Sequence, residues 1–263
     1  MVQKFKDNNC KKECNSILIT GACGGIGNFL ARELSKSGWK VIATDHPNKC
    51  KGNNLLNDVH AFIKQDLQTL LSDPTQKSKF IEKVKQYCSV YPLKAIINNA
   101  AIQNIKLFEE LTDEDWLQSI KVNLLAPISI CRSLMHLLEK NNGSIINISS
   151  IHSLLTKKGF SSYSTTKAAL TGLTKSLSVE IGFKVRVNAI EPAAIETPML
   201  MEGFKENKLA FEKLKMFHPT NSIGSPEDVF NAVLFLLDPS NKFLNGCILS
   251  LTGGIHNCLH DPA

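Results

Sequence analysis

The sequence has no long hydrophobic run. None of the apolar stretches in its 263 residues approaches the length needed to span a bilayer. The first of them, residues 17–19, is also too short to be the core of a signal peptide. The sequence therefore predicts no association with a membrane and a cytoplasmic location. We interpret the polar residues 1–15, which precede this run, as an N-terminal leader.

A disulfide framework and a zinc-binding pattern are also missing. The eight cysteines are scattered along the chain, and several stand in apolar or helical contexts. This distribution is typical of free thiols in a reducing compartment. Three residues separate Cys10 from Cys14, but no second pair of cysteines or histidines has a matching spacing. We therefore predict no metal site.

The chain has little net charge and no internal division. Its formal charge of +6 is spread along the sequence, so nucleic-acid binding is not indicated, although an acidic substrate or protein partner would be compatible. There is no internal repeat, low-complexity segment or linker. A chain of this length that is 43% hydrophobic is expected to form one well-cored domain, over residues 16–263.

Short apolar runs alternate with helical patterns along the whole sequence. The runs are continuous rather than alternating, which is typical of parallel strands buried on both faces. They occupy residues 16–20, 39–44, 59–64, 95–97, 144–149, 185–190 and 247–251. The alternation predicts an α/β fold, a single Rossmann-like doubly wound domain in which a parallel seven-stranded sheet has helices on both faces.

Two of the intervening segments have features of their own. The helix expected over 113–139 begins with a capping threonine, Thr112, and contains Pro127, which predicts a kink or local break. The segment of about 193–221 is irregular and rich in methionine and phenylalanine. We expect it to form a substrate lid with apolar packing; alternatively, these side chains only fasten two short helices to the body.

A glycine-rich turn connects the first strand to the first helix, with the sequence Thr20-Gly21-Ala22-Cys23-Gly24-Gly25-Ile26-Gly27. Glycines let the backbone approach a pyrophosphate, which binds at the positive end of the following helix. The spacing departs from the standard dinucleotide fingerprint. The position of the turn nevertheless favours nucleotide binding over a tight connection without a ligand.

Asp45 stands at the end of the second strand, eighteen residues after Gly27. A carboxylate there accepts hydrogen bonds from the adenosine ribose and repels a 2′-phosphate. The next residues, His46 and Pro47, offer no guanidinium for such a phosphate. The sequence thus favours NAD over NADP, the alternative being an aspartate that only caps its strand.

Tyr163 and Lys167 are four residues apart at the start of a helical pattern. Side chains at this spacing lie on one face of a helix. A cation beside a phenol favours the phenolate and is expected to lower the tyrosine pKa towards the neutral range. On its own, such a pair is more often part of a solvated helix face.

Taken together and in this order, the motifs resemble those of classical short-chain dehydrogenases/reductases, over about residues 16–254. The segment 98–101 corresponds to the family's Asn-Asn-Ala-Gly, and Asn98 is expected to contact the cofactor ribose. The resemblance implies four catalytic residues, Asn123, Ser150, Tyr163 and Lys167. The cofactor contacts that it implies are Gly21, Cys23, Gly24, Gly25, Ile26, Gly27, Asp45, Asp66, Leu67, Asn99, Ala100, Tyr163, Lys167, Pro192, Ile195 and Thr197.

The resemblance also implies an activity, hydride transfer between a small alcohol or ketone and NAD. Ser150 would position the substrate oxygen and Tyr163 would exchange the proton. Lys167 would lower the phenol pKa and bind the nicotinamide ribose. Asn123 would hold a water that reaches Lys167, or would instead bridge a bend near Pro127. A homo-oligomer, tetramer or dimer, is implied as well.

The sequence departs from the family pattern at several positions. Glu191 places a charge where a small or neutral residue is usual, and Ala193 and Ala101 replace glycines. These changes affect the expected shape of the pocket and remove no catalytic group.

Three functions stay open at this point. The first is an NAD-dependent alcohol or sugar dehydrogenase. The second is a 3-oxoacyl-carrier-protein reductase, which usually goes with NADPH and an arginine where this glycine loop has Gly24. The third is a nucleotide-binding sensor without catalysis, although the intact Ser150, Tyr163 and Lys167 argue against it.

Overall fold

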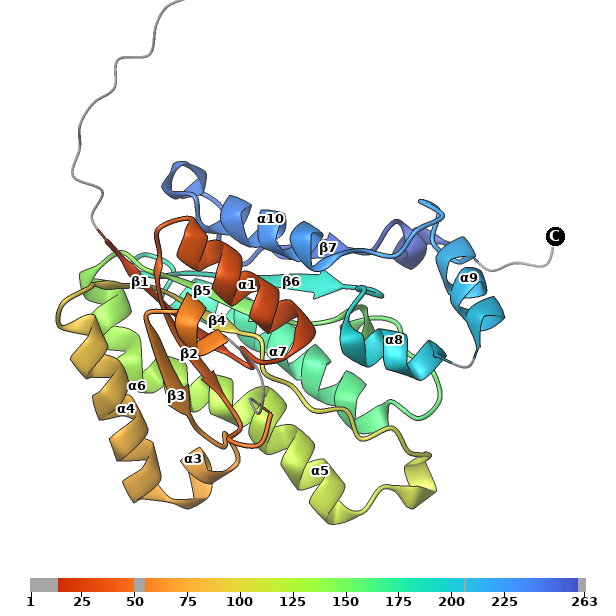
Figure 1. Ribbon diagram of the computed structural model, residues 1–263, viewed down its shortest axis with the longest axis horizontal. Helices are drawn as coiled ribbons and strands as arrows, with labels where there is room; N and C mark the ends of the chain where they lie inside the picture. Colours follow the sequence, from red (N-terminus) through yellow and green to blue (C-terminus); the bar gives the residue numbers. More distant parts are fainter. Residues whose placement is uncertain (1–13, 50–54, 206, 260–263) are drawn as a thin grey trace, which may run out of the picture.

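The predicted apolar runs form the strands of one sheet (Figure 1). The structure is a computed structural model that describes residues 14–49, 55–205 and 207–259; the predicted leader lies outside them up to residue 13. All strand pairs are parallel, so the predicted seven-stranded parallel sheet is confirmed. The strands are β1 (Ser16–Thr20), β2 (Lys40–Asp45), β3 (Ala61–Lys64), β4 (Leu93–Asn98), β5 (Ser144–Ile148), β6 (Arg186–Pro192) and β7 (Ile248–Leu251).

The strand order, β3-β2-β1-β4-β5-β6-β7, is that of a doubly wound sheet. From β1 the chain builds outwards through β2 to β3, then returns to the other side of β1 with β4 and builds outwards again. The order therefore reverses between β1 and β4. In open parallel sheets ligands bind in the crevice beyond the carboxyl ends of the strands at this reversal.

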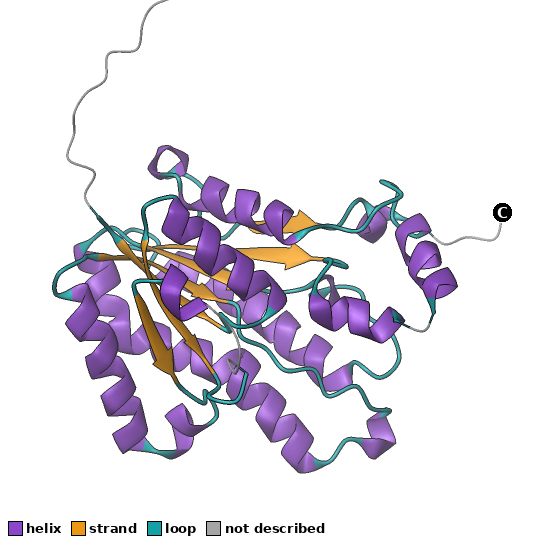
Figure 2. Ribbon diagram, viewed as in Figure 1, coloured by secondary structure: helices purple, strands orange, loops and turns teal. Residues whose placement is uncertain are grey.

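Helices cover both faces of the sheet, as Figure 2 shows. The α-helices are α1 (Gly25–Lys36), α2 (Leu55–Asp58), α3 (Thr69–Ser72), α4 (Pro74–Cys88), α5 (Asp113–Ile120), α6 (Ala126–Lys140), α7 (Ser161–Glu180), α8 (Pro198–Phe204), α9 (Lys208–Met216) and α10 (Pro226–Leu237). A π-helical segment, η2 (Lys121–Leu125), joins α5 to α6. The 3₁₀ turns are η1 (Phe108–Glu110), η3 (Ile151–Ser153), η4 (Pro239–Asn241) and η5 (Ile255–Asn257).

Alternate residues of the strands supply two separate hydrophobic cores. Leu18 and its neighbours on other strands pack against buried side chains of α4 and α6, such as Phe80 and Leu134. Ile17 and Ile19 point the other way and pack with side chains of α1 and α10. This two-residue period is that of a strand. Because both faces are buried, the prediction of helices on both sides of the sheet is confirmed.

The helix expected over 113–139 is interrupted, as Pro127 predicts, but by a π-helical segment. The N–H of Ala126 donates to the carbonyl of Lys121, five residues earlier. Pro127 has no N–H, so it cannot donate to the carbonyl of Asn123 as a regular helix would require. Pro127 thus coincides with a bulge in the helix around Asn123. Such bulges often accompany functional sites.

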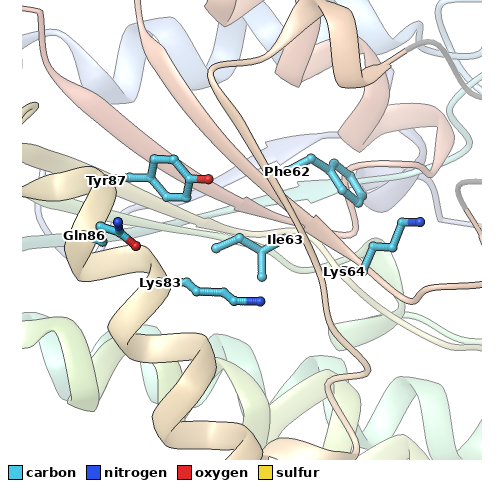
Figure 3. Close-up of a pocket in the computed structure, with 6 residues that line it drawn as sticks. All are labelled: Phe62, Ile63, Lys64, Lys83, Gln86 and Tyr87. Carbon is cyan, nitrogen blue, oxygen red and sulfur yellow. The ribbon is translucent and has the colours of Figure 1, made fainter.

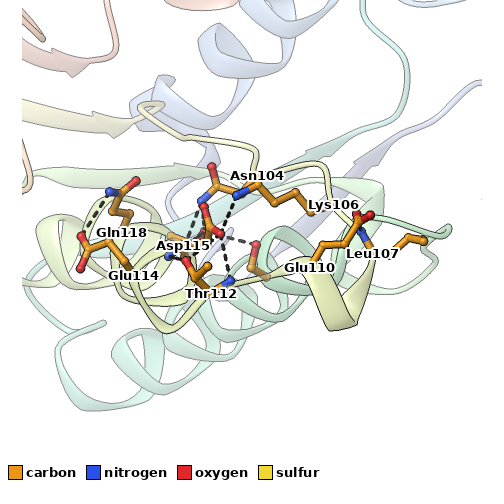
Figure 4. Close-up of polar contacts among 10 residues, drawn as sticks. Asn104, Lys106, Leu107, Glu110, Thr112, Glu114, Asp115 and Gln118 are labelled. Atoms are coloured by element: carbon orange, nitrogen blue, oxygen red, sulfur yellow. Dashed lines mark hydrogen bonds and ion pairs between the residues drawn. The ribbon is translucent and has the colours of Figure 1, made fainter.

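A polar cluster holds the start of α5 against the loop after β4 (Figure 4). Thr112 accepts a hydrogen bond from the N–H of Asp115 at 3.2 Å, and the Asp115 carboxylate accepts one from the N–H of Thr112 at 3.0 Å. Lys106 lies 2.7 Å from the same carboxylate. The hydrogen bond from Lys106, followed by those from Thr112, lowers the pKa of Asp115 to about 2. The predicted cap is confirmed, and it anchors the loop that carries residues 101–106.

The predicted lid consists of α8 and α9. The rings of Phe204 and Phe211 pack together, with centroids 5.7 Å apart, and so join the two helices. Met201, Met216 and Phe217 are exposed. Phe204 and Phe211 thus fasten the two short helices to each other, whereas the three exposed side chains do not fasten them to the body. The side chain of Met199 lies outside the described part.

The prediction that all cysteines are free thiols is wrong at one described position. Cys14, Cys88, Cys131, Cys247 and Cys258 are free. Cys23, in the glycine loop, is disulfide-bonded. Pairing depends on a short separation in space, which sequence spacing does not reveal. Among the helices of the described residues, none has the length and apolar character to cross a membrane.

Candidate active site

The glycine loop folds tightly between β1 and α1. Gly21 has a φ of +67°, in the left-handed region that favours glycine. A Cβ on Gly27 would lie 2.1 Å from the carbonyl oxygen of Gly21, so only glycine lets the helix approach the loop this closely. A Cβ on Gly25 would lie 2.7 Å from Thr197. The loop therefore brings the start of α1 next to the segment that follows β6.

The first turn of α1 is suited to an anion. Its N-cap, Gly24, has no side chain to cap the free N–H groups, and the first turn has no acidic residue. The N–H groups of Gly25, Ile26 and Gly27 are thus those that a regular helix leaves without internal partners. Together with the helix dipole they favour a phosphate group, so the loop fits the diphosphate of a dinucleotide.

Asp45 lies beside this loop and is only 6% exposed. Its carboxylate accepts hydrogen bonds from the N–H of Cys23 at 2.8 Å and from the N–H of His46 at 2.7 Å. The strand end and the glycine loop are thereby tied together through a negative charge. The carboxylate of Asp66 lies nearby, 3.7 Å from His46 Nε2. Leu67, in contrast, is buried in the core, so only its backbone is placed for a ligand.

The side chains of the two neighbouring asparagines at the end of β4, Asn98 and Asn99, point in different directions. The side chain of Asn99 donates to the carbonyls of Thr20 and Gly21 at 3.1 and 3.0 Å. Thr20 Oγ1 accepts from the N–H groups of Asn99 and Ala100, both at 3.1 Å. Asn98 faces inwards and donates to Asn147 Oδ1 at 2.8 Å. The Asn98 side chain is therefore not placed to make the expected ribose contact, because alternation along the strand turns it into the interior.

Three of the four predicted catalytic residues come together where β5 ends and α7 begins. Ser150 follows β5, and Tyr163 and Lys167 lie on the first turns of α7; all three are buried. Side-chain hydrogen bonds from Gln103 and Ser150 reach the Tyr163 phenol. Lys167 Nζ lies 5.6 Å from the centroid of the Tyr163 ring and donates to the carbonyl of Ile148 at 2.6 Å. Gln103 is a contact that the sequence patterns did not single out.

The protonation of this group differs from the expectation. Burial raises the pKa of Tyr163, and the hydrogen bonds from Gln103 and Ser150 only oppose that rise. Burial also lowers the pKa of Lys167, to about 8. The prediction that Lys167 lowers the tyrosine pKa is thus not met by the protein alone, because loss of solvent around the phenol sets the direction of the shift, and what opposes it are the hydrogen bonds with Gln103 and Ser150. At neutral pH the phenol carries its proton.

Asn123 lies in the π-helical segment, and both the oxygen and the nitrogen of its side chain form hydrogen bonds within the protein. Its oxygen accepts from the N–H of Ile102 at 2.9 Å, and its nitrogen donates to the Ile102 carbonyl and to Thr166 Oγ1, both at 3.0 Å. The side chain therefore bridges the loop after β4 to α7, rather than the bend near Pro127 that the sequence offered as the alternative. Only its backbone carbonyl, freed by Pro127, is a candidate to hold a water.

The His152 ring packs against one side of the Tyr163 ring. Its ring stacks on Phe160 with centroids 4.5 Å apart and meets the Tyr163 ring edge-on at 5.7 Å. Burial, aided by the charge of Lys157, lowers the pKa of His152 to about 4. The imidazole is consequently neutral at pH 7 and can donate or accept a hydrogen bond beside the Tyr163 phenol.

The short chain dehydrogenase family matches residues 15–208. The chain belongs to this family. It is also 34% identical over 244 residues to an uncharacterised oxidoreductase of Schizosaccharomyces pombe, covering 91% of this chain and 90% of that one. The short-chain dehydrogenase is therefore an oxidoreductase, of a family that binds nicotinamide cofactors.

Other relatives have assigned activities. The 3-oxoacyl-[acyl-carrier-protein] reductase of Aquifex aeolicus is 34% identical over 243 residues, which cover 90% of this chain and 96% of that protein. Aldohexose dehydrogenase of Thermoplasma acidophilum, solved without ligand, superposes with a TM-score of 0.84 at 26% identity over 95% of this chain and 96% of that one. The similarity confirms the Rossmann-like fold and leaves the substrate open.

The remaining cofactor candidates of this short-chain dehydrogenase line the end of β6. Pro192 is the last residue of that strand. Ile195 is buried and pairs with Gly224. Thr197 caps α8 by accepting from the N–H of Leu200 at 3.3 Å, and its side chain packs directly against Gly25. In the described part of the chain no three His, Cys, Asp or Glu side chains are grouped as a metal site would require.

A surface pocket of about 400 Å³ lies elsewhere, between the edge strand β3 and α4 (Figure 3). Its lining residues are Phe62, Ile63, Lys64, Lys83, Gln86 and Tyr87. None of the candidate catalytic or cofactor residues is among them. This pocket is therefore separate from the candidate site.

Proposed function

We propose that this short-chain dehydrogenase interconverts a secondary alcohol and a ketone with NAD(H), and that Tyr163 is its general acid and base. The observation that carries the proposal is the buried group of Ser150, Tyr163 and Lys167. Parallel strands end at the same edge of a sheet, so this group and the glycine loop share the crevice beyond β1, β4 and β5.

The side chains have distinct parts in the proposed reaction. When bound, the nicotinamide cofactor supplies or accepts the hydride. The Ser150 hydroxyl donates a hydrogen bond to the substrate oxygen and holds it beside the Tyr163 phenol. In the reductive direction the phenol gives its proton to the developing alkoxide, and in the oxidative direction the phenolate takes the hydroxyl proton. The Lys167 ammonium stabilises the phenolate, and a water on the Asn123 carbonyl returns the proton.

The choice of NAD rests on the charge of Asp45. Its buried carboxylate lies where the adenosine ribose would be expected and would repel a 2′-phosphate. Solved neighbours at 26% and 28% identity include a 4-hydroxyisoleucine dehydrogenase with NADH and a protein named ElxO with NADP. Both cofactors thus occur on this fold, so the support comes from Asp45 itself.

Reduction of 3-oxoacyl groups is the second candidate, favoured by the similarity to the Aquifex aeolicus reductase. That activity is expected to go with NADPH. The glycine loop here has Gly24 at the position where an arginine would serve the extra phosphate, and Asp45 opposes it. We therefore place this function after an NAD-dependent alcohol dehydrogenase.

The two functions can be separated by cofactor and substrate. Fluorescence titration of the purified protein should show tighter binding of NADH than of NADPH, by about tenfold or more if the carboxylate makes a charged hydrogen bond to the ribose. A panel of secondary alcohols, sugars, ketones and 3-oxoacyl thioesters should then give turnover with NAD(H) on an alcohol or ketone. Tighter NADPH binding with 3-oxoacyl reduction would favour the second candidate, and binding without any turnover would favour a sensor.

We also propose that the protein is a homo-oligomer. Val179, Phe183 and Phe243 are exposed, Phe243 completely, and the Asn245 side chain ties their segments together by donating to the Ser178 carbonyl at 2.8 Å. Grouped exposed apolar side chains are typical of protein interfaces. Light scattering in solution should give the mass of a dimer or tetramer, and Phe243→Ser should reduce it. A monomeric mass for the unmodified protein would contradict the proposal.

A further inference from the structure

Glu191 is a buried carboxylate that the proposed reaction does not use. It is the second-last residue of β6 and is 5% exposed. None of the ion pairs formed among the described residues includes it. Burial of a charge without compensating contacts is costly. A carboxylate kept there must be compensated by hydrogen bonds.

Two hydroxyl groups supply these bonds, both to one oxygen. Glu191 Oε1 accepts from Ser153 Oγ in a short hydrogen bond and from Thr171 Oγ1 at 2.7 Å. Thr171 Oγ1 also lies 2.9 Å from Ser149 Oγ. The Ser149 hydroxyl has one hydrogen for two neighbouring acceptors, Thr171 Oγ1 and the Lys167 carbonyl at 3.1 Å. Glu191 Oε1 thus accepts two hydroxyl hydrogen bonds, and one of the two donors, Thr171, also contacts Ser149.

The partners of Glu191 belong to the elements that carry the catalytic group. Ser153 ends η3, the turn whose N-cap is Ser150, and its N–H donates back to the Ser150 carbonyl at 2.9 Å. Thr171 lies on α7, one turn beyond Lys167 and two turns beyond Tyr163. Ser149 directly precedes Ser150. One carboxylate oxygen at the end of β6 therefore links η3 to α7.

We propose that Glu191 is a positioning residue of this dehydrogenase, whose Oε1 holds η3 against α7 so that the Ser150 hydroxyl and the Tyr163 phenol face one substrate oxygen. This inference rests on the proposed function of those two residues. Removing the carboxylate leaves two partly buried hydroxyls without their acceptor and lets η3 shift. A displacement of about 1 Å in a catalytic group can cost about 100-fold in rate.

Steady-state kinetics of Glu191→Ala and Glu191→Gln test the proposal. In Glu191→Ala, kcat should fall by about 10- to 100-fold, while the NADH dissociation constant stays unchanged. In Glu191→Gln, the amide oxygen can still accept from Ser153 and Thr171, so most of the activity should return. Glu180→Gln removes an exposed carboxylate from the last turn of α7 and should behave as wild type.

Hydrogen exchange gives a readout that does not need turnover. Amides 151–155, which close η3, should exchange faster in Glu191→Ala and at the wild-type rate in Glu191→Gln. This measurement decides the positioning role even if the wild-type protein shows no dehydrogenase activity, so failure of the proposed function is recognised separately. Ser153→Ala removes one of the two bonds without emptying the core, and it should also speed exchange and lower kcat if Glu191→Ala does not fold.

Three results would overturn the positioning role. The first is unchanged kcat and unchanged exchange in Glu191→Ala, or in Ser153→Ala where Glu191→Ala does not fold. The second is a loss in Glu191→Gln equal to that in Glu191→Ala, because the charge rather than the acceptor would then matter. The third is a parallel loss of NADH affinity and kcat, which a general structural defect would produce.

Discussion

Replacing Tyr163 with phenylalanine should lower kcat by about 100- to 10,000-fold, the usual contribution of a general acid or base. The change removes one oxygen and keeps the ring that packs against His152 and Phe160. Burial keeps the proton on the phenol, so the lost group is the proton donor of the reductive direction. NADH binding, measured by fluorescence, should persist because the glycine loop and Asp45 are untouched.

A matched control is available on α4, beside the edge strand β3. Tyr87 lies on α4, in the surface pocket of Figure 3, and Tyr87→Phe makes the same chemical change away from the crevice. Its kcat should equal that of the wild-type protein. Undiminished turnover in Tyr163→Phe would remove this residue from the proposed role, and loss of turnover in both variants would indicate a defect in folding.

The same protonation states predict opposite effects of pH on the two directions. Since burial raises the pKa of Tyr163, the protonated phenol needed for ketone reduction is present at neutral pH. Alcohol oxidation needs the phenolate, so its rate should rise as pH increases. The pKa of Lys167, lowered to about 8, sets a limit, because above it the ammonium that stabilises the phenolate loses its charge.

The sheet could be predicted from sequence because its signals are local. Each strand is a short apolar run, and each connection carries glycines, prolines or caps that end one element and begin the next. Pro127 predicted a break in its helix, because a residue without an N–H cannot continue the regular hydrogen-bond pattern. Pro127 predicts where the regular hydrogen bonds are interrupted but not the form of the break, so the π-helical segment over residues 121–125 was not predicted.

The candidate site was predicted less completely, because its contacts join residues far apart in the chain. Spacing brought Tyr163 and Lys167 onto one helix face, and the structure places them there. The direction of the tyrosine pKa was wrong, since a pair of residues says nothing about burial. Gln103 reaches the phenol from another loop. Asn98 turns inwards to Asn147, a partner 49 residues away.

The second large effect is expected at Asp45. Asp45→Asn removes the charge and almost preserves the shape of the side chain, whose oxygens hold the N–H groups of Cys23 and His46. A hydrogen bond to a charged group contributes about 1.5–3 kcal/mol, so NADH should bind about 10- to 100-fold more weakly if the ribose uses this carboxylate. The affinity for NADPH should not fall in this way. It should rise, because the 2′-phosphate is no longer repelled by a carboxylate.

The ratio of the two dissociation constants separates this charge effect from a simple loosening of the loop. An asparagine has one acceptor oxygen for two backbone donors, so the glycine loop can relax, and that relaxation weakens NADH and NADPH alike. Only the lost charge changes the ratio in favour of NADPH. Asp113→Asn, on the exposed first turn of α5, should change neither constant. A ratio in Asp45→Asn equal to that of the wild-type protein would show that Asp45 only fastens the loop and does not select the cofactor.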